Sequence, residues 1–199
     1  MADGHFTNSG SLIVELAQKD LYHLECLAAF LSSSSLKKRK NSCRLSIRNK
    51  RIILFVCKKF EIVNNKTYNP PSLSVFEKMT DNQFVSFFAG FIDGDGCIFT
   101  PSRHTTPNLT VKNHISWIDQ LSYFKNRTYK ILNLKPIKSK NLDGRKNNAG
   151  YAVINISDAE VLSKLKGIIN QLNLPIMSRN WDKVPNGYVS RYRPRKNNK

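Results

Sequence analysis

The sequence predicts an α/β (α+β) fold made of two similar halves, each with helices packed against antiparallel strands. The main observation is that helical and strand-like segments follow in the same order twice along the chain. The tripeptide Ala2-Asp3-Gly4 also aligns with Gly94-Asp95-Gly96, and the two aspartates are 95 − 3 = 92 residues apart. With 199 residues and 40% apolar content, the chain can form two half-domains of roughly 100 residues each.

In the first half, apolar residues predict a strand at 12–16 and then a helix at 21–31 with leucines along one face. A serine run and the consecutive basic residues at 37–40 predict a loop. An apolar helix is predicted at 52–60. Residues 64–72 contain two adjacent prolines and predict a linker to the second half.

The second half begins with a predicted helix whose two ends are marked in the sequence. Thr80 and Gln83 have the spacing of a capping box, and the phenylalanines after them recur at helical spacing. Gly94 or Gly96 is expected to end the helix in a left-handed turn. Because the negative end of the helix dipole lies there, Asp95 would sit in a field that attracts a hard divalent cation.

The rest of the second half repeats the plan of the first. A strand at 109–112 is followed by an amphipathic helix that begins at 115–121, and then by a basic polar loop at 138–148. Residues 151–156 alternate as a strand, and 161–172 carry a final helical stripe of apolar residues. The predicted organisation is a first half at 1–68, a linker at 69–80, a second half at 81–176 and a basic tail at 177–199.

The charge of the chain indicates a polyanionic partner. The net charge is 32 − 14 = +18 and the isoelectric point is about 10.0, far more basic than solubility requires. The alternative is a generally basic protein, such as a ribosomal one. No apolar run approaches the roughly 18 residues of a membrane span, so no membrane partner is expected. The four cysteines lie far apart without CxxC spacing, which argues against a zinc site.

The nine residues from Phe88 to Gly96 resemble the LAGLIDADG motif of homing endonucleases and maturases. Phe88 and Phe91 occupy the two leucine positions, and Gly94 replaces the second alanine. Ala2-Asp3-Gly4 is similar to the end of a first copy. The resemblance therefore implies the two-repeat, single-chain type of this family, with a first motif that is truncated at the N-terminus. The chain is expected to start inside that motif.

The resemblance also implies the site residues. In the family, two motif helices pack side by side, and the acidic residue at the eighth motif position binds metal. Asp3 and Asp95 occupy that position here and are the expected ligands of Mg²⁺, whereas Asp93 is expected to support the helix end. In the family, polar residues of the strands that follow the motif also take part in catalysis. The corresponding residues here are Glu15 and Lys112, with Arg48 as a further basic candidate. Glu15 departs from the family pattern. The expected helix interface comprises Phe88, Ala89, Gly90 and Ile92.

A DNA-binding saddle is expected on the exposed faces of the strands. Residues 44–48 alternate, so that Leu45 and Ile47 face the core while the polar residues face outward. The alternative is that the outward side chains are ordinary solvated residues. The expected nucleic-acid contacts are Arg44, Ser46, Arg48, Lys37, Lys38, Thr110, Lys112, Asn155, Lys138, Lys140 and Arg145.

The expected function is that of an intron-encoded, site-specific DNA endonuclease, which makes a double-strand break at a long target site to promote intron homing. The alternatives are an RNA maturase that assists splicing of its host intron, and a catalytically inactive DNA-binding relic. Double-stranded DNA and the host intron RNA are the corresponding partners. The active chain is expected to be a monomer if an upstream helix is supplied. Abundant residues with AT-rich codons and no import sequence favour an origin in the mitochondrion.

Overall fold

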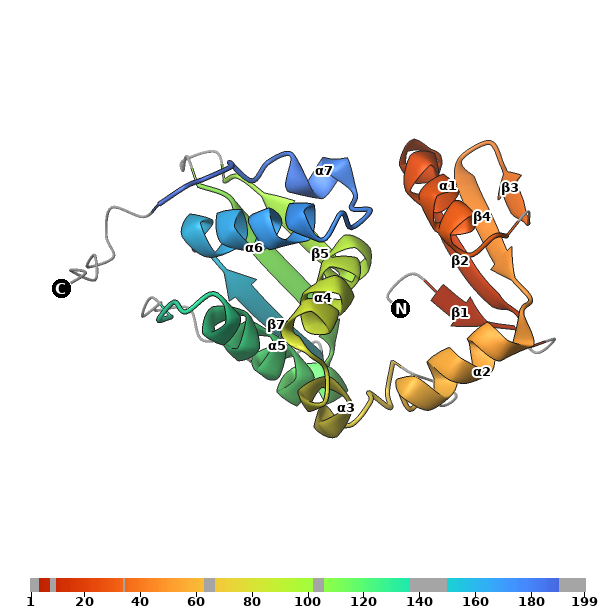
Figure 1. The fold of residues 1–199 in the computed structure, drawn as a ribbon, viewed down its shortest axis with the longest axis horizontal. Helices are drawn as coiled ribbons and strands as arrows, with labels where there is room; N and C mark the ends of the chain where they lie inside the picture. The colour runs from red at the N-terminus through yellow and green to blue at the C-terminus, as the bar shows by residue number, and fades with distance from the viewer. Residues whose placement is uncertain are drawn as a thin grey trace.

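The computed structural model describes residues 4–7, 10–33, 35–62, 67–101, 106–136 and 150–189. The first half contains β1 (Gly4–Phe6), β2 (Leu12–Ala17), η1 (Gln18–Asp20), α1 (Leu21–Phe30), β3 (Leu36–Lys38), β4 (Ser42–Ile47) and α2 (Lys50–Lys59). The second half contains α3 (Leu73–Glu77), α4 (Asp81–Asp95), β5 (Gly96–Phe99), β6 (Asn108–His114), η2 (Ile115–Trp117), α5 (Ile118–Ile131), β7 (Tyr151–Ile156), α6 (Ala159–Gln171) and α7 (Ser178–Trp181). Figure 1 shows the two halves side by side. The described helices include none that is long and apolar enough to cross a membrane.

The first half is an antiparallel sheet of order β1-β2-β4-β3 with α1 packed on one face. The predicted strands and helices at 12–16, 21–31 and 52–60 are confirmed, and Leu45 and Ile47 face the core as expected. The predicted loop at 37–40 is wrong in part, because its first two residues belong to β3. That short edge strand forms because β4 supplies its backbone hydrogen bonds.

The second half is an antiparallel sheet of order β5-β6-β7. The helices α4 and α5 pack on one face of it, and α6 packs against both of them (Figure 1). The predicted strands at 109–112 and 151–156 and the helix at 161–172 are confirmed. Because β7 alternates between core and surface, Ala152, Ile154 and Ile156 lie in the core.

The two halves are equivalent strand by strand. Gly4 of β1 pairs with Val14 of β2, and Gly96 of β5 pairs with Val111 of β6. The next strand continues the correspondence, because β4 pairs with β2 as β7 pairs with β6. This register confirms two pseudo-symmetric halves and equates each position of β2 with one of β6.

The sequence correctly predicts how helix α4 begins but not how it ends. Its capping box is confirmed, since the Thr80 side chain accepts from Gln83 N and the Gln83 side chain accepts from Thr80 N. The predicted left-handed turn is wrong. Gly96 has φ −96° and ψ 159°, so the chain leaves the helix in an extended conformation and enters β5 directly. Glycine is required there for space, because a Cβ at Gly96 would lie 2.6 Å from the Ile92 carbonyl oxygen.

We expect Gly96→Ala to lower the free energy of unfolding by about 1–3 kcal/mol, because the added methyl group overlaps backbone that cannot give way. Gly90→Ala in the same helix is the matched control. A Cβ at Gly90 meets nothing within 4 Å, so this change should raise stability by roughly 0.5–1 kcal/mol. Urea denaturation of both variants measures the difference, and equal stabilities would contradict the steric argument.

Two segments expected to lie outside the halves are part of the folded second half, which corrects the predicted linker and tail. Within 69–80, α3 buries Phe76 in the core, and Arg127 of α5 donates to the carbonyl oxygens of Phe76 and Met79. Within 177–199, α7 buries Trp181 completely. Neither short helix has an apolar period long enough to be visible in sequence.

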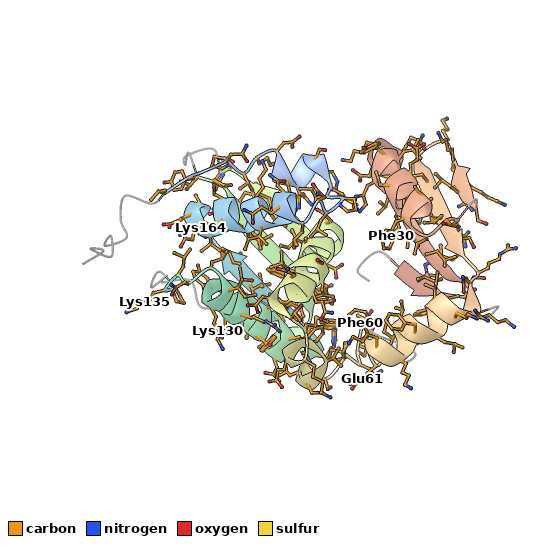
Figure 2. The ribbon with its side chains drawn as sticks, viewed as in Figure 1. Phe30, Phe60, Glu61, Lys130, Lys135 and Lys164 are labelled. Carbon is orange, nitrogen blue, oxygen red and sulfur yellow. The ribbon has the colours of Figure 1, made fainter. Side chains whose placement is uncertain are left out.

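The segment around α7 also joins the two halves. The Met177 side chain lies in the apolar core of the first half. Arg179 Nε lies 3.0 Å from Asp20 Oδ1, which belongs to the 3-10 turn before α1. On the other side of the molecule the halves are connected through the chain between α2 and α3 (Figure 1). The ring of Phe60, which follows α2 (Figure 2), stacks on the ring of Phe87 in α4 with centroids 5.8 Å apart.

Candidate active site

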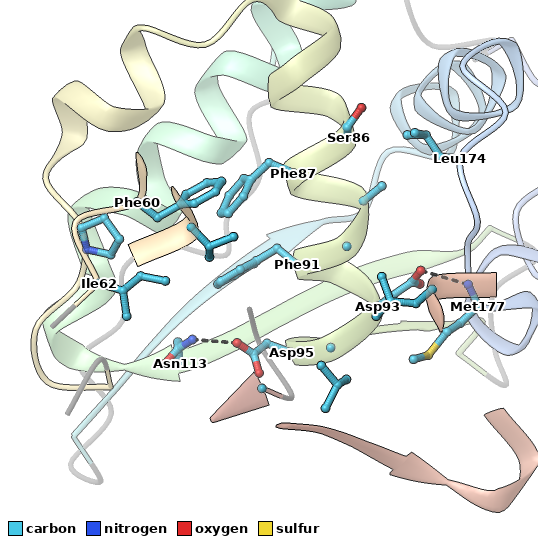
Figure 3. A pocket seen from close by; sticks show the side chains of 18 of the residues that line it. Phe60, Ile62, Ser86, Phe87, Phe91, Asp93, Asp95, Asn113, Leu174 and Met177 are labelled. Atoms are coloured by element: carbon cyan, nitrogen blue, oxygen red, sulfur yellow. Dashed lines mark hydrogen bonds between the residues drawn. The ribbon is translucent and has the colours of Figure 1, made fainter. Parts of the chain in front are cut away.

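The carboxylate of Asp95 lies at the C-terminal end of α4, where the motif helix meets the second sheet. It is half-buried, and Asn113 Nδ2 on β6 donates a hydrogen bond of 3.0 Å to Asp95 Oδ2 (Figure 3). The other end of the Asn113 amide is also held, because its Oδ1 accepts from His114 N at 2.8 Å. The amide orientation is therefore fixed, and with it the orientation of the carboxylate.

A largely apolar groove of about 490 Å³ runs between the two halves and reaches Asp95 (Figure 3). The second half contributes the Ala89-Gly90 face of α4, and the first half contributes Val14, Leu16 and Leu27. This is the face of α4 to which the family resemblance assigns a second motif helix. Its small residues leave room for close approach of another backbone.

The predicted helix interface is corrected in part. Ala89 and Gly90 line the groove as expected. Phe88 and Ile92 are fully buried in the core of the second half instead. The helical period explains the division, since residues four apart share one face of a helix and these two face the sheet.

Asp93 is a structural carboxylate. It is only 2% exposed, and it accepts hydrogen bonds from Met177 N at 2.9 Å and from Trp181 Nε1 at 3.0 Å. Burial raises the pKa of this carboxyl above its ordinary 3.8, and the hydrogen bonds and the nearby His23 oppose the rise. Asp93 thus anchors the α7 segment to the motif helix.

This raised pKa predicts how Asp93 changes stability with pH. The folded chain holds the Asp93 proton more tightly than the unfolded chain, so the contribution of Asp93 falls as pH rises from about 3.8 through the folded-state pKa. The unfolding free energy of the wild type minus that of Asp93→Asn should therefore decrease across this window. Urea denaturation of both proteins at a series of pH values tests this, and a difference that increased with pH would contradict it.

The sheet face opposite the helices carries several of the predicted nucleic-acid residues. In the first half, Arg44 and Ser46 point to this face. In the second half, Thr110 Oγ1 donates to Asn155 Oδ1 at 2.7 Å across the two strands. Lys112 is exposed on the same face, and its Nζ lies 4.0 Å from the centroid of the Tyr151 ring.

Other predicted site residues lie elsewhere. Lys38 Nζ pairs with Glu25 of α1 at 3.1 Å, so this side chain faces the helical side and not the open sheet face. Lys37, the preceding residue of β3, lies opposite Arg44 of β4 in the strand register and therefore points to the open sheet face. Arg48 is exposed beyond the end of β4, where the sheet no longer fixes its direction. Asp3, Lys138, Lys140 and Arg145 lie outside the described residues.

Glu15 lies on the open sheet face and away from Asp95. Its carboxylate accepts from Ser42 Oγ at 2.8 Å and lies 3.5 Å from Arg39 Nη1. The strand register makes Glu15 the counterpart of Lys112, as the sequence alignment of the two repeats suggested. Glu15 does not line the groove that reaches Asp95, because strand alternation turns its side chain to the face opposite that of Val14 and Leu16, which do line it.

Asn113 is the site residue that the sequence analysis missed. Strand alternation places it on the same face as Val111, under the helices, whereas the predicted site residues of this strand, Thr110 and Lys112, are at outward positions. The sequence signal for Asn113 is a polar side chain at an inward position of a strand that pairs with the strand starting at Gly96.

The residues at this site fit a hard divalent cation. Asp95 offers carboxylate oxygen at the negative end of a helix, which is the kind of ligand that Mg²⁺ takes in proteins. Among the described residues, no group of three or more His, Cys, Asp or Glu side chains gathers around a possible metal position. Asp95 is thus the described residue that would hold the ion.

The fold defines a class of protein that has two pseudo-symmetric α/β halves. Solved structures of this class are LAGLIDADG homing endonucleases, and this chain has their fold. The similar structures include I-GzeII with its DNA target (TM-score 0.52, 12% identity, 87% of this chain and 81% of that one). They also include I-SmaMI bound to cleaved DNA (0.51, 13%, 92% and 83%) and I-CpaMI bound to uncleaved DNA (0.50, 10%, 90% and 81%). No family model and no curated protein matches the sequence.

Proposed function

We propose that this protein is a site-specific DNA endonuclease that uses Mg²⁺ and promotes homing of the intron that encodes it. The observation that carries the proposal is the Asp95 carboxylate, held by Asn113 at the end of the motif helix in a fold shared with DNA-bound endonucleases. Hydrolysis of a phosphodiester needs charge stabilisation beside the scissile phosphate, and this site can supply it.

The open sheet faces are the proposed DNA-binding surface. The major groove of DNA admits a two-stranded ribbon, and the outward side chains of Arg44, Thr110 and Lys112 can reach phosphates and base edges from such strands. Charge alone does not locate this surface, because Lys130, Lys135 and Lys164 project from the helical side of the second half (Figure 2). The strand geometry selects the sheet.

Each residue of the proposed site has a separate task. Asp95 would hold the divalent ion, which when bound would polarise the phosphate and lower the pKa of a water bound to it. Asn113 keeps the carboxylate in one orientation, so that no reorganisation is needed during the reaction. Lys112 precedes Asn113 on the same strand and points to the proposed DNA-binding face. There its positive charge offsets the negative charge of the phosphate.

Selection from a pool of random DNA duplexes, without Mg²⁺, tests the DNA-binding part of the proposal. We expect recovery of one long, nearly asymmetric sequence that binds in preference to a shuffled duplex and to an RNA of the same sequence. Preference for structured RNA would support the maturase alternative. Specific DNA binding without cleavage in Mg²⁺ would support the alternative of a catalytically inactive DNA-binding relic.

We expect Asn113→Ala to lower the cleavage rate about 10- to 100-fold, as is typical when the hydrogen-bond partner of a metal-binding group is removed. The overall fold should be retained because Asn113 is only half-buried. Single-turnover cleavage of the selected duplex measures the effect. Asn170→Ala, at an exposed position of α6 on the helical side, is the control, and equal losses in both variants would contradict a role for Asn113 at the site.

A further inference from the structure

The two halves present different side chains at equivalent positions next to the cleavage site. Since Val14 is equivalent to Val111 by register, Glu15 corresponds to Lys112 and Leu16 corresponds to Asn113. Each pair keeps the same face of its sheet, because strand alternation is preserved. The first half therefore has an acid where the second half has a base, and an aliphatic side chain where the second half has an amide.

The position of Leu16 cannot support a metal-binding carboxylate. Leu16 is only 7% exposed and belongs to the apolar core of the first half, together with Leu24 and Met177. A leucine side chain has no hydrogen to donate, whereas Asn113 donates to Asp95. At this position of β2, the described part of the first half therefore lacks the hydrogen-bond donor that fixes the carboxylate in the second half.

The position of Glu15 is also unfavourable for a scissile phosphate. The carboxylate points to the open sheet face, where Lys112 provides a cation in the other half. Its contacts with Ser42 and Arg39 are made at a partly exposed site, so its negative charge is only partly offset. A DNA phosphate at this position would be repelled, and one beside Lys112 would be attracted.

We propose that the two halves differ in activity and that the enzyme nicks one DNA strand, the strand served by Asp95, Asn113 and Lys112. This inference rests on the proposed endonuclease function. Cutting of the opposite strand is slower by about 10- to 100-fold, which is the usual effect of losing the group that orients a metal ligand. At the active half, the oxygen of a water molecule bonds to phosphorus as one phosphorus–oxygen ester bond breaks. The departing sugar oxygen gains a proton, and the other product ends in a phosphate.

The products of a supercoiled plasmid that carries the selected site distinguish the outcomes. We expect the open-circular form to accumulate in Mg²⁺ long before linear DNA appears, with the cut confined to one end-labelled strand of a short duplex. Linear DNA formed without an open-circular stage, and both labelled strands cut at similar rates, would overturn the inference while leaving the endonuclease function intact. Specific binding with no cut in either strand would instead contradict the proposed function itself.

Variants that give the first half the residues of the second test the cause. Glu15→Lys combined with Leu16→Asn should raise the rate of cutting of the slow strand at least about tenfold. Leu16 is buried, so thermal unfolding of this double variant is measured first. Glu15→Lys alone is the variant that keeps the core unchanged, and it should also speed the slow strand.

A binding measurement without metal provides a readout that is separate from activity. In EDTA, Glu15→Lys should tighten binding to the selected duplex and steepen the dependence of log affinity on log salt by about one, because one more cation faces the phosphates. Glu77→Lys on α3, an exposed position on the helix that packs against α5, is the matched control and should leave the slope unchanged. If Glu15→Lys also leaves the slope unchanged, Glu15 does not face the DNA and the inference is wrong.

Discussion

Replacing Asp95 with asparagine is expected to lower the rate of DNA cleavage about a hundred- to a thousandfold, because a metal ion held beside the phosphate supplies several kcal/mol of transition-state stabilisation. Asparagine has nearly the shape of aspartate but lacks its negative charge. The half-buried position and the hydrogen bond from Asn113 indicate that the fold tolerates the change. Single-turnover cleavage in Mg²⁺ measures the loss, and affinity for the selected duplex should change little.

Asp81→Asn is the matched control for this experiment. Asp81 lies in the first turn of the same helix, at the end away from the site, and its exposed carboxylate pairs with Arg127 at 3.3 Å. The same change of charge there should leave the cleavage rate unaltered. Full activity of Asp95→Asn, or equal losses of activity in the two variants, would show that Asp95 is not an active-site residue.

Replacing Asp93 with alanine is expected to lower the free energy of unfolding by about 2–4 kcal/mol, because two buried N–H donors lose their acceptor. These donors are Met177 N and Trp181 Nε1, and both belong to the segment that joins the halves. Urea denaturation, followed by tryptophan fluorescence, measures the loss. Asp182→Ala, an exposed carboxylate next to Trp181, is the control and should change stability by less than about 0.5 kcal/mol.

An effect of Asp93→Ala as small as that of the control would show that the carboxylate does not hold the α7 segment. A second readout separates this role from catalysis. At a temperature where Asp93→Ala remains folded, it should retain more cleavage activity than Asp95→Asn, although the two residues are neighbours in the motif. We therefore predict different roles for the two acidic residues of one motif, Asp93 for stability and Asp95 for cleavage.

Elements governed by short-range patterns could be predicted from the sequence. The spacing of Thr80 and Gln83 is enough to define the start of α4, and the alternation of 151–156 is enough to define β7. The position of Asp95 at the helix end follows from the motif, because a helix of known start and period must end near the glycines. These features depend on residues within about one turn or one strand of each other.

Features governed by distant contacts could not be predicted in this way. Asn113, which donates to Asp95, lies 18 residues away on β6, and the residues that donate to Asp93 lie 84 and 88 residues away. A left-handed turn is predicted at Gly96 because glycine commonly occupies such turns. In the structure, glycine is needed at this position because the Ile92 backbone approaches too closely for a side chain. Lys38 is expected on the DNA face, but its register opposite the core residue Cys43 puts it on the helical side, where its Nζ lies 3.1 Å from Glu25.

The most direct test of the central claim is denaturing-gel analysis of an end-labelled duplex that carries the selected site, incubated with the protein in Mg²⁺ or in EDTA. A metal-dependent endonuclease predicts one discrete shorter fragment in Mg²⁺, none in EDTA and none from a shuffled duplex. A protein that binds the duplex specifically but yields no fragment in Mg²⁺, or that cuts the shuffled duplex equally well, would contradict the claim.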